Sequence, residues 1–139
     1  MHPMVNIAVR AARAAGNIIS RNIDRLDRVH VENKGRYDFV SDIDRQAEGA
    51  ILQTLQRAYP NHAILAEESG EHWRGKGNAE YTWIVDPLDG TANFLHGYPH
   101  VGVSIALRHF DQLEVGVVYD PMRQELFTAH RGNGAQLDG

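Results

Sequence analysis

Hydrophobic residues in the first part of the chain recur at helical spacing. Between residues 4 and 23 the apolar side chains lie three and four positions apart, which predicts an amphipathic helix packed on the body of the protein. The same segment carries arginines and no acidic residue, as transit peptides do, so a cleaved leader is the weaker alternative. Residues 31–41, centred on Lys34-Gly35-Arg36, are predicted to form a loop or a weak hairpin.

A second helix is predicted after Ser41. A serine followed three residues later by an acid, here Asp44, and then by helical periodicity is typical of a helix start. The helix is expected to run from about Asp42 to Ala58 and to stop at Tyr59-Pro60-Asn61, because proline cannot continue it. Its expected inward-facing residues are Ala47, Ile51, Leu52 and Leu55.

Beyond residue 60 the periodicity changes from that of helices to that of strands. Residues 70–80 are polar and contain three glycines, and they are predicted to be a mobile loop. A short helix is expected after Thr91. Two helices followed by several strands predict a chain of the α+β class. The expected strands are Ala63–Ala66, Tyr81–Val85, Val101–Leu107, Glu114–Tyr119 and Glu125–His130, with turns at Asp120-Pro121 and Gly132-Asn133-Gly134.

Composition narrows the class of protein. The 139 residues fit one domain, and 42% of them are hydrophobic, which is enough for a packed core. Without cysteine there is no disulfide, thiolate metal site or cysteine nucleophile, and a reducing, cytoplasmic location is expected. No apolar run approaches the roughly 20 residues of a membrane helix. Eight histidines show no zinc-ligand spacing, and no serine-hydrolase or nucleotide-binding loop motif is present.

The net charge of −4 is unevenly distributed. Residues 1–36 hold seven basic and three acidic side chains, a net of +4, and residues 37–139 hold seven basic and fifteen acidic ones, a net of −8. An acidic body disfavours general nucleic-acid binding and suits a site that collects divalent cations. The N-terminal arginines could form a nucleic-acid face, but the solvent side of the first helix is the preferred interpretation. They are Arg10, Arg13, Arg21, Arg25 and Arg28.

The strongest chemical signal is Asp86-Pro87-Leu88-Asp89-Gly90-Thr91. Two carboxylates and the Leu88 carbonyl are oxygen ligands that suit hard cations such as Mg²⁺. Pro87 is expected to stop the strand, and Thr91 is expected to cap a helix whose free N–H groups bind an anion. Metal ligands beside a phosphate site are typical of metal-assisted phosphate-ester hydrolysis. A plain turn is the alternative, since these residues also favour turns.

A second acidic pair closes another predicted strand. Glu67-Glu68 follows Ala66 and could face the first pair across a cation, or it could be a solvated loop. Asp44 has two interpretations: a purely structural member of the Ser41 capping box, which is the preferred one in isolation, or a third acid that orients a water molecule. Lys34 on its glycine-containing loop has no specific signal.

Taken together, these residues resemble the inositol monophosphatase family of Mg²⁺-dependent, lithium-sensitive phosphatases. Three segments carry the resemblance, which extends over the whole chain: Asp38–Asp44, Ala66–Ser69 and Trp83–Phe94. Residues 1–13 and 118–123 resemble a bacterial branch of the family in particular. The resemblance implies a layered αβαβα sugar-phosphatase fold, here represented by two long helices and a mainly antiparallel sheet.

The resemblance also implies roles for individual residues. Metal ligation is implied for Glu67, Asp86, Asp89 and the Leu88 carbonyl, and Glu68 would engage a further metal through water. Asp44 and Thr91 would polarise the attacking water, and the amides of Gly90 and Thr91 would hold the phosphate. Lys34 would lie in a mobile loop over the site. The implied catalytic set is Asp44, Glu68 and Thr91, and the implied substrate-binding set is Glu67, Leu88, Asp89, Gly90 and Thr91.

One departure from the family pattern concerns length. Family members are about twice as long, and their second half carries a Trp-Asp motif that neither tryptophan here supplies, because Trp73 precedes Arg74 and Trp83 precedes Ile84. Residues 1–139 are therefore expected to be the N-terminal metal-binding part of a longer protein, and to be inactive alone. The expected substrate is an inositol phosphate or a related sugar phosphate, with no membrane contact.

A second role implied by the resemblance is binding rather than catalysis. Bacterial members of this kind act in antitermination of ribosomal RNA transcription through contacts with Nus factors and RNA polymerase, and the two roles can coexist. A change at Asp89 is expected to separate them, because it should stop hydrolysis and leave binding intact. Whether a homodimer forms is left open.

Overall fold

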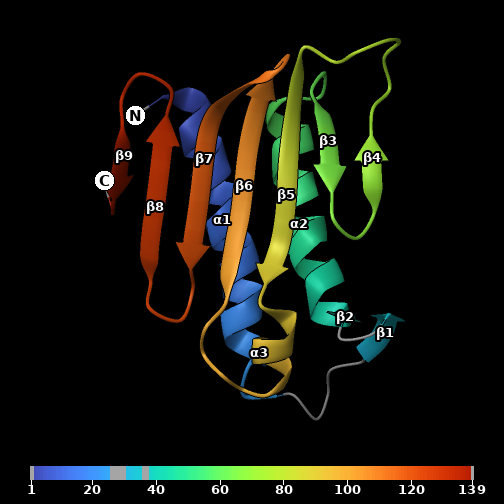
Figure 1. Cartoon of the computed structure of the whole chain (residues 1–139), viewed down its shortest axis with the longest axis vertical. Coiled ribbons are helices and arrows are strands. Elements are labelled where there is room, and N and C mark those ends of the chain that lie inside the picture. The colour runs from blue at the N-terminus through green and yellow to red at the C-terminus, as the bar shows by residue number, and fades with distance from the viewer. Residues whose placement is uncertain (1, 26–30, 36–37, 139) are drawn as a thin grey trace.

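The computed structural model describes residues 2–25, 31–35 and 38–138, and its elements are drawn in Figure 1. The helices are α1 (Pro3–Asn22), α2 (Asp42–Ala58) and α3 (Thr91–Leu95). The strands are β1 (Val31–Gly35), β2 (Asp38–Ser41), β3 (Ala63–Ala66), β4 (Gly70–His72), β5 (Tyr81–Asp89), β6 (Gly102–His109), β7 (Gln112–Asp120), β8 (Glu125–His130) and β9 (Ala135–Leu137). A small two-stranded antiparallel sheet, β1 with β2, precedes α2. The remaining strands form one seven-stranded sheet in the order β4-β3-β5-β6-β7-β8-β9.

The two long helices lie side by side against one face of the seven-stranded sheet, and the other face is open (Figure 1). Every neighbouring pair of strands in that sheet is antiparallel except β3 with β5, which is parallel. The predicted α+β class and mainly antiparallel sheet are therefore confirmed. No helix in the described ranges is long and apolar enough to cross a membrane.

The first helix packs closely because its inward face is made of small side chains. Ala8, Ala11, Ala12 and Ala15 are all fully buried against the core. A Cβ atom at Gly16 would lie 2.4 Å from the Tyr119 ring, so only glycine fits there. The predicted helix over residues 4–23 is confirmed with bounds shifted by one residue, and Arg10, Arg13 and Arg21 are on its exposed side. Arg25 is also exposed, and Arg28 lies outside the described residues.

The second helix has the predicted bounds, Asp42 to Ala58. Ala47, Ile51 and Leu55 are fully buried, whereas Leu52 is only partly buried at the margin of the core. The weak hairpin expected over residues 31–41 is present as β1 and β2, although Arg36 at its centre lies outside the described residues. The side chain of Lys34 also lies outside them, so its expected role stays a prediction.

The strand predictions need three corrections. Residues 70–72, expected to begin a mobile loop, form edge strand β4, because their backbone pairs with β3. Strand β5 does not end before Asp86 but continues to Asp89. Strand β9 was not predicted; it follows the expected turn at Gly132–Gly134 and pairs with β8. In each case a neighbouring strand supplies hydrogen bonds that no local sequence signal encodes.

Strand β5 is anchored near its beginning by a buried tryptophan. The indole N–H of Trp83 donates a hydrogen bond to His62 Nδ1 at 3.1 Å, and the His62 ring stacks between Tyr59 and Tyr81. Burial lowers the pKa of His62 below its ordinary value, against the opposing charge of Glu80. The neutral ring that results keeps Nδ1 available as an acceptor. Trp83 and His62 therefore hold the strand that carries the acidic motif.

Candidate functional site

The two acidic segments meet at one edge of the sheet because β3 and β5 are parallel. Ala66 is the register partner of Val85, and the next amide, that of Glu67, donates to the Val85 carbonyl at 3.1 Å. Parallel neighbours end at the same edge, so Glu67 follows β3 beside the position of Asp86 in β5. The structure thus brings together two motifs that are about twenty residues apart in the sequence. Glu67 is exposed and Glu68 is partly buried.

Asp44 connects the start of α2 to the end of β5. Its Oδ1 accepts hydrogen bonds from the Ser41 amide, at 2.8 Å, and from the Ser41 hydroxyl. The Asp44 amide donates in turn to Ser41 Oγ at 3.2 Å, which completes a capping box. Its Oδ2 accepts a hydrogen bond from the Thr91 hydroxyl at 2.8 Å. That hydroxyl also lies 3.2 Å from the Leu88 carbonyl oxygen. Asp44 is almost fully buried, and its structural role in the capping box is confirmed. The other interpretation, a third acid that orients a water molecule, stays a prediction.

A residue that the sequence interpretation missed is Glu48, one helical turn after Asp44. Its side chain is 3% exposed. Oε1 accepts a hydrogen bond from the Glu68 amide at 2.9 Å, and Oε2 accepts one from the Ser69 amide at 3.0 Å. The spacing of four from Asp44 places both carboxylates on one helix face, and that was the only available sequence signal. It did not indicate a partner, since the partner loop is twenty residues away.

The acidic end of β5 is built differently from the predicted turn. Pairing with β6 is regular up to Asp86 and resumes at Asp89, which pairs with Gly102, with an irregularity between them. Pro87 lies in this interval, where its missing N–H costs no regular ladder bond. The Leu88 side chain is buried, so this residue can offer the site only its backbone carbonyl. Asp89 is exposed. Pro87 therefore disturbs the strand locally and does not stop it.

The predicted helix cap is also corrected. Gly90, not Thr91, is the N-cap of α3, with φ 99° and no side-chain cap hydrogen bond. Thr91 is the first helical residue, and its hydroxyl is used by Asp44 instead. The φ of Gly90 is left-handed, a conformation that glycine adopts at the lowest cost. Since α3 has only five residues, few peptide dipoles are aligned, and the helix dipole can attract an anion only weakly.

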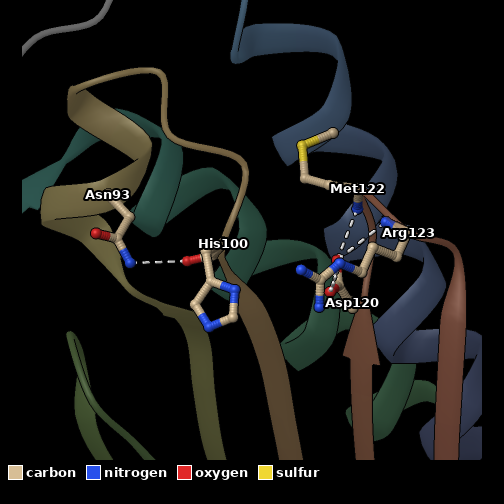
Figure 2. A network of polar contacts seen from close by, with 5 residues as sticks. All are labelled: Asn93, His100, Asp120, Met122 and Arg123. Atoms are coloured by element: carbon tan, nitrogen blue, oxygen red, sulfur yellow. Dashed lines mark hydrogen bonds and ion pairs between the residues drawn. The ribbon is translucent and has the colours of Figure 1, made fainter.

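The loop after α3 folds back over Gly90. The side-chain amide of Asn93 donates to the His100 carbonyl at 2.9 Å, which closes the loop (Figure 2). The same carbonyl oxygen would lie 2.9 Å from a Cβ atom at Gly90. Figure 2 also shows Asp120, whose Oδ1 accepts the Met122 and Arg123 amides in the turn predicted at Asp120-Pro121.

Replacing Gly90 with alanine in the full-length protein is expected to lower the melting temperature. The left-handed conformation should cost about 1–3 kcal/mol, and contact with the His100 carbonyl should add to it. Gly132→Ala is the matched control, because Gly132 has φ +86° but no atom within 4 Å of its added Cβ. Calorimetry should show a larger loss for Gly90→Ala than for Gly132→Ala. Equal losses would show that the close approach at Gly90 has no energetic weight.

The donor set at this edge fits a hard cation in its chemistry. Oδ1 of Asp86 is buried, and no described residue gives it a hydrogen bond, whereas a cation would satisfy it. The Leu88 carbonyl oxygen has two lone pairs, so it can bind a cation with one while the other faces the Thr91 hydroxyl. Within the described ranges, however, no three His, Asp or Glu side chains are grouped closely enough to hold one metal ion. The expected common ligation by Glu67, Asp86 and Asp89 therefore stays a prediction.

Comparison with known proteins places these features in context. Residues 1–139 match the sequence model of the inositol monophosphatase family. The chain is 55% identical to the Nus factor SuhB of Escherichia coli (strain K12) over 139 residues, which is all of this chain and 51% of the relative. The chain thus spans about half the length of the curated relatives that it matches.

Solved structures agree with the fold. The extragenic suppressor protein suhB from Bartonella henselae superposes with a TM-score of 0.94 at 43% identity, over 99% of this chain and 52% of that one. An IMPase/NADP phosphatase solved as a complex with NADP and Ca²⁺ has a TM-score of 0.78 at 29% identity, over 91% of this chain and 47% of that one. The expected resemblance, including its bacterial branch, is confirmed.

Proposed function

The chain belongs to the inositol monophosphatase family, and from this premise we propose that the protein containing it hydrolyses a sugar- or inositol-phosphate monoester with the help of Mg²⁺. Residues 1–139 would be the N-terminal part of the site, completed by the remainder of the protein. The proposed products are the free alcohol and inorganic phosphate. Sensitivity to lithium belongs to the same proposal.

One observation carries the proposal: two residues 47 positions apart, Asp44 and Thr91, meet at 2.8 Å beside the acidic ends of β3 and β5. A capping box alone would not need the second carboxylate oxygen of Asp44, because Ser41 uses only Oδ1. The contact therefore orients the Thr91 hydroxyl. With its proton directed to Asp44, the Thr91 oxygen can accept a hydrogen bond from a water molecule and make that water a better nucleophile.

The remaining residues have complementary proposed roles. Glu67, Asp86, Asp89 and the Leu88 carbonyl would hold Mg²⁺, which supplies positive charge at the phosphate and lowers the pKa of a nearby water when it is bound. Glu68 would contact a further ion through water, and the amides of Gly90 and Thr91 would bind phosphate oxygens. Water would attack phosphorus directly, and the ester P–O bond would break to release the alcohol.

The test is a phosphate-release assay on the full-length protein with inositol 1-phosphate. We expect activity with Mg²⁺ and none after chelation. Thr91→Val, which keeps the shape and removes the hydroxyl, should lower turnover by about 100-fold or more. Thr91→Ser keeps the hydroxyl and should stay within about tenfold of the natural protein. Equal activity of the two variants would contradict the role of the hydroxyl, and absence of Mg²⁺-dependent hydrolysis of any sugar phosphate would contradict the function.

A second candidate function is transcription antitermination through contacts with Nus factors and RNA polymerase. It is favoured by one observation, the 55% identity to a protein named as a Nus factor. This role would depend on surfaces for protein contact and not on the acidic edge. Pull-down of purified Nus factors or RNA polymerase by the full-length protein tests it, and no binding to either would contradict it.

A further inference from the structure

The turn that carries Glu67 and Glu68 is attached to α2 by a buried carboxylate. Glu48 presents one oxygen to the Glu68 amide and the other to the Ser69 amide, at 2.9 and 3.0 Å. Glu48 is only 3% exposed, so water has little access to form hydrogen bonds with its carboxylate in place of these two amides. Because the two donors are consecutive backbone N–H groups, the contact fixes the path of the backbone directly behind Glu67.

A glutamate is required for this contact because the two backbone groups are both donors. A carboxylate offers two acceptor oxygens, whereas a glutamine offers one oxygen and one NH₂ group. In Glu48→Gln one amide N–H would face another donor and lose its partner. Glutamate is therefore the residue type that suits position 48, because the Glu68–Ser69 turn presents two donors to it.

The same face of α2 also contacts the other acidic segment, which is the end of β5. Asp44 precedes Glu48 by one helical turn and binds Thr91, which follows Asp89 and Gly90 at the end of β5. The end of β3 and the end of β5 are therefore both fixed to α2, at successive turns. A rigid helix between them sets the position of one acidic segment relative to the other.

We propose that Glu48 is a positioning residue, which holds the Glu67–Glu68 turn in the place where its carboxylates bind a divalent cation together with the end of β5. The proposal rests on the proposed metal-dependent function, but its structural part concerns only residues of this chain. Loss of a residue that orients metal ligands without contacting the metal typically lowers metal affinity by 10–100-fold. Glu48 would act through the turn and would not contact the substrate.

The test uses the full-length protein and two measurements that do not need turnover. Hydrogen exchange without metal should show the Glu68 and Ser69 amides protected in the natural protein, and exchange at least about tenfold faster in Glu48→Gln. Calorimetric titration with Mg²⁺ should show an affinity about 10–100-fold weaker in the variant. Glu71→Gln is the matched control, since it removes the same charge from an exposed glutamate in neighbouring β4 and should change neither quantity.

The outcomes separate the two proposals. If the natural protein shows no metal-dependent hydrolysis while Glu48→Gln still weakens Mg²⁺ binding and speeds exchange, the proposed function fails and the positioning role stands. If the natural protein is active and Glu48→Gln changes neither exchange nor affinity, the positioning role is overturned. Should Glu48→Gln not fold, the natural protein remains decisive: exchange of both amides at the rate of an open turn would overturn the proposal.

Discussion

Replacing Asp89 with asparagine in the full-length protein is expected to reduce Mg²⁺-dependent turnover by more than about 100-fold, because even residues behind a metal ligand contribute 10–100-fold. Asp89 is the last residue of β5 and is exposed, at the edge where the acidic segments meet. Its carboxylate is therefore expected to contribute little to folding stability. An amide keeps the shape and removes the charge that a cation needs. The melting temperature without Mg²⁺ should change by no more than a few degrees, as for other exposed substitutions.

Asp111→Asn provides the matched control. Asp111 is an exposed acid in the turn between β6 and β7, at the opposite end of the sheet from α3 (Figure 1). The same chemical change there should leave turnover and Mg²⁺ dependence unchanged. A large loss of melting temperature for Asp89→Asn in the absence of Mg²⁺ would identify Asp89 as structural instead. In the same preparation, retained binding to Nus factors or RNA polymerase would separate the two candidate functions.

Residues 1–139 produced alone are expected to aggregate or to form a molten state without phosphatase activity. The face of the sheet opposite the helices is open (Figure 1). Large apolar side chains on it are exposed. Val118, Phe127 and Leu137 are cross-strand neighbours on this face and are 46, 44 and 52% exposed. Covering about 400 Å² of such surface is worth about 10 kcal/mol, which is comparable to the whole stability of a domain.

Two adjacent valines provide a matched test. Val117 is 1% exposed on the helix side, whereas Val118 is 46% exposed on the open side. In the isolated segment, Val118→Thr should reduce aggregation and dye binding to exposed apolar surface, and Val117→Thr should increase both. In the full-length protein both changes should lower the melting temperature, because the open face would then be covered. A monomeric segment with a cooperative melting curve and full activity would contradict this prediction.

Local hydrogen-bond and periodicity signals determined the helices from the sequence alone. The bounds of α2 could be predicted because Ser41 and Asp44, three residues apart, form the capping box that begins it. The sequence also placed each acidic motif directly after a strand-like run, which is right for Glu67-Glu68 after β3 but wrong for Asp86 and Asp89, which lie within β5. Such signals extend over a few residues and therefore need no knowledge of the fold.

The site itself was decided by tertiary structure. That Glu67 lies beside Asp86 depends on β3 and β5 being parallel neighbours, with β4 placed at the edge. No local pattern encodes strand order, because the hydrogen bonds that determine it join residues far apart in the chain. The extension of β5 past Pro87 likewise depended on β6, which resumes pairing at Asp89 after the irregular interval.

Asp44 and Glu48 show the same division most clearly. The sequence by itself determined that both residues belong to one face of a helix, since the spacing of four is a property of the helix. The family resemblance implied Asp44 and Thr91 as a pair, but only the tertiary structure shows their contact and the amides after Glu67 that Glu48 binds. The physical reason is that a buried carboxylate must find hydrogen-bond donors, but which donors reach it depends on the chain segments that the sheet brings to that helix face.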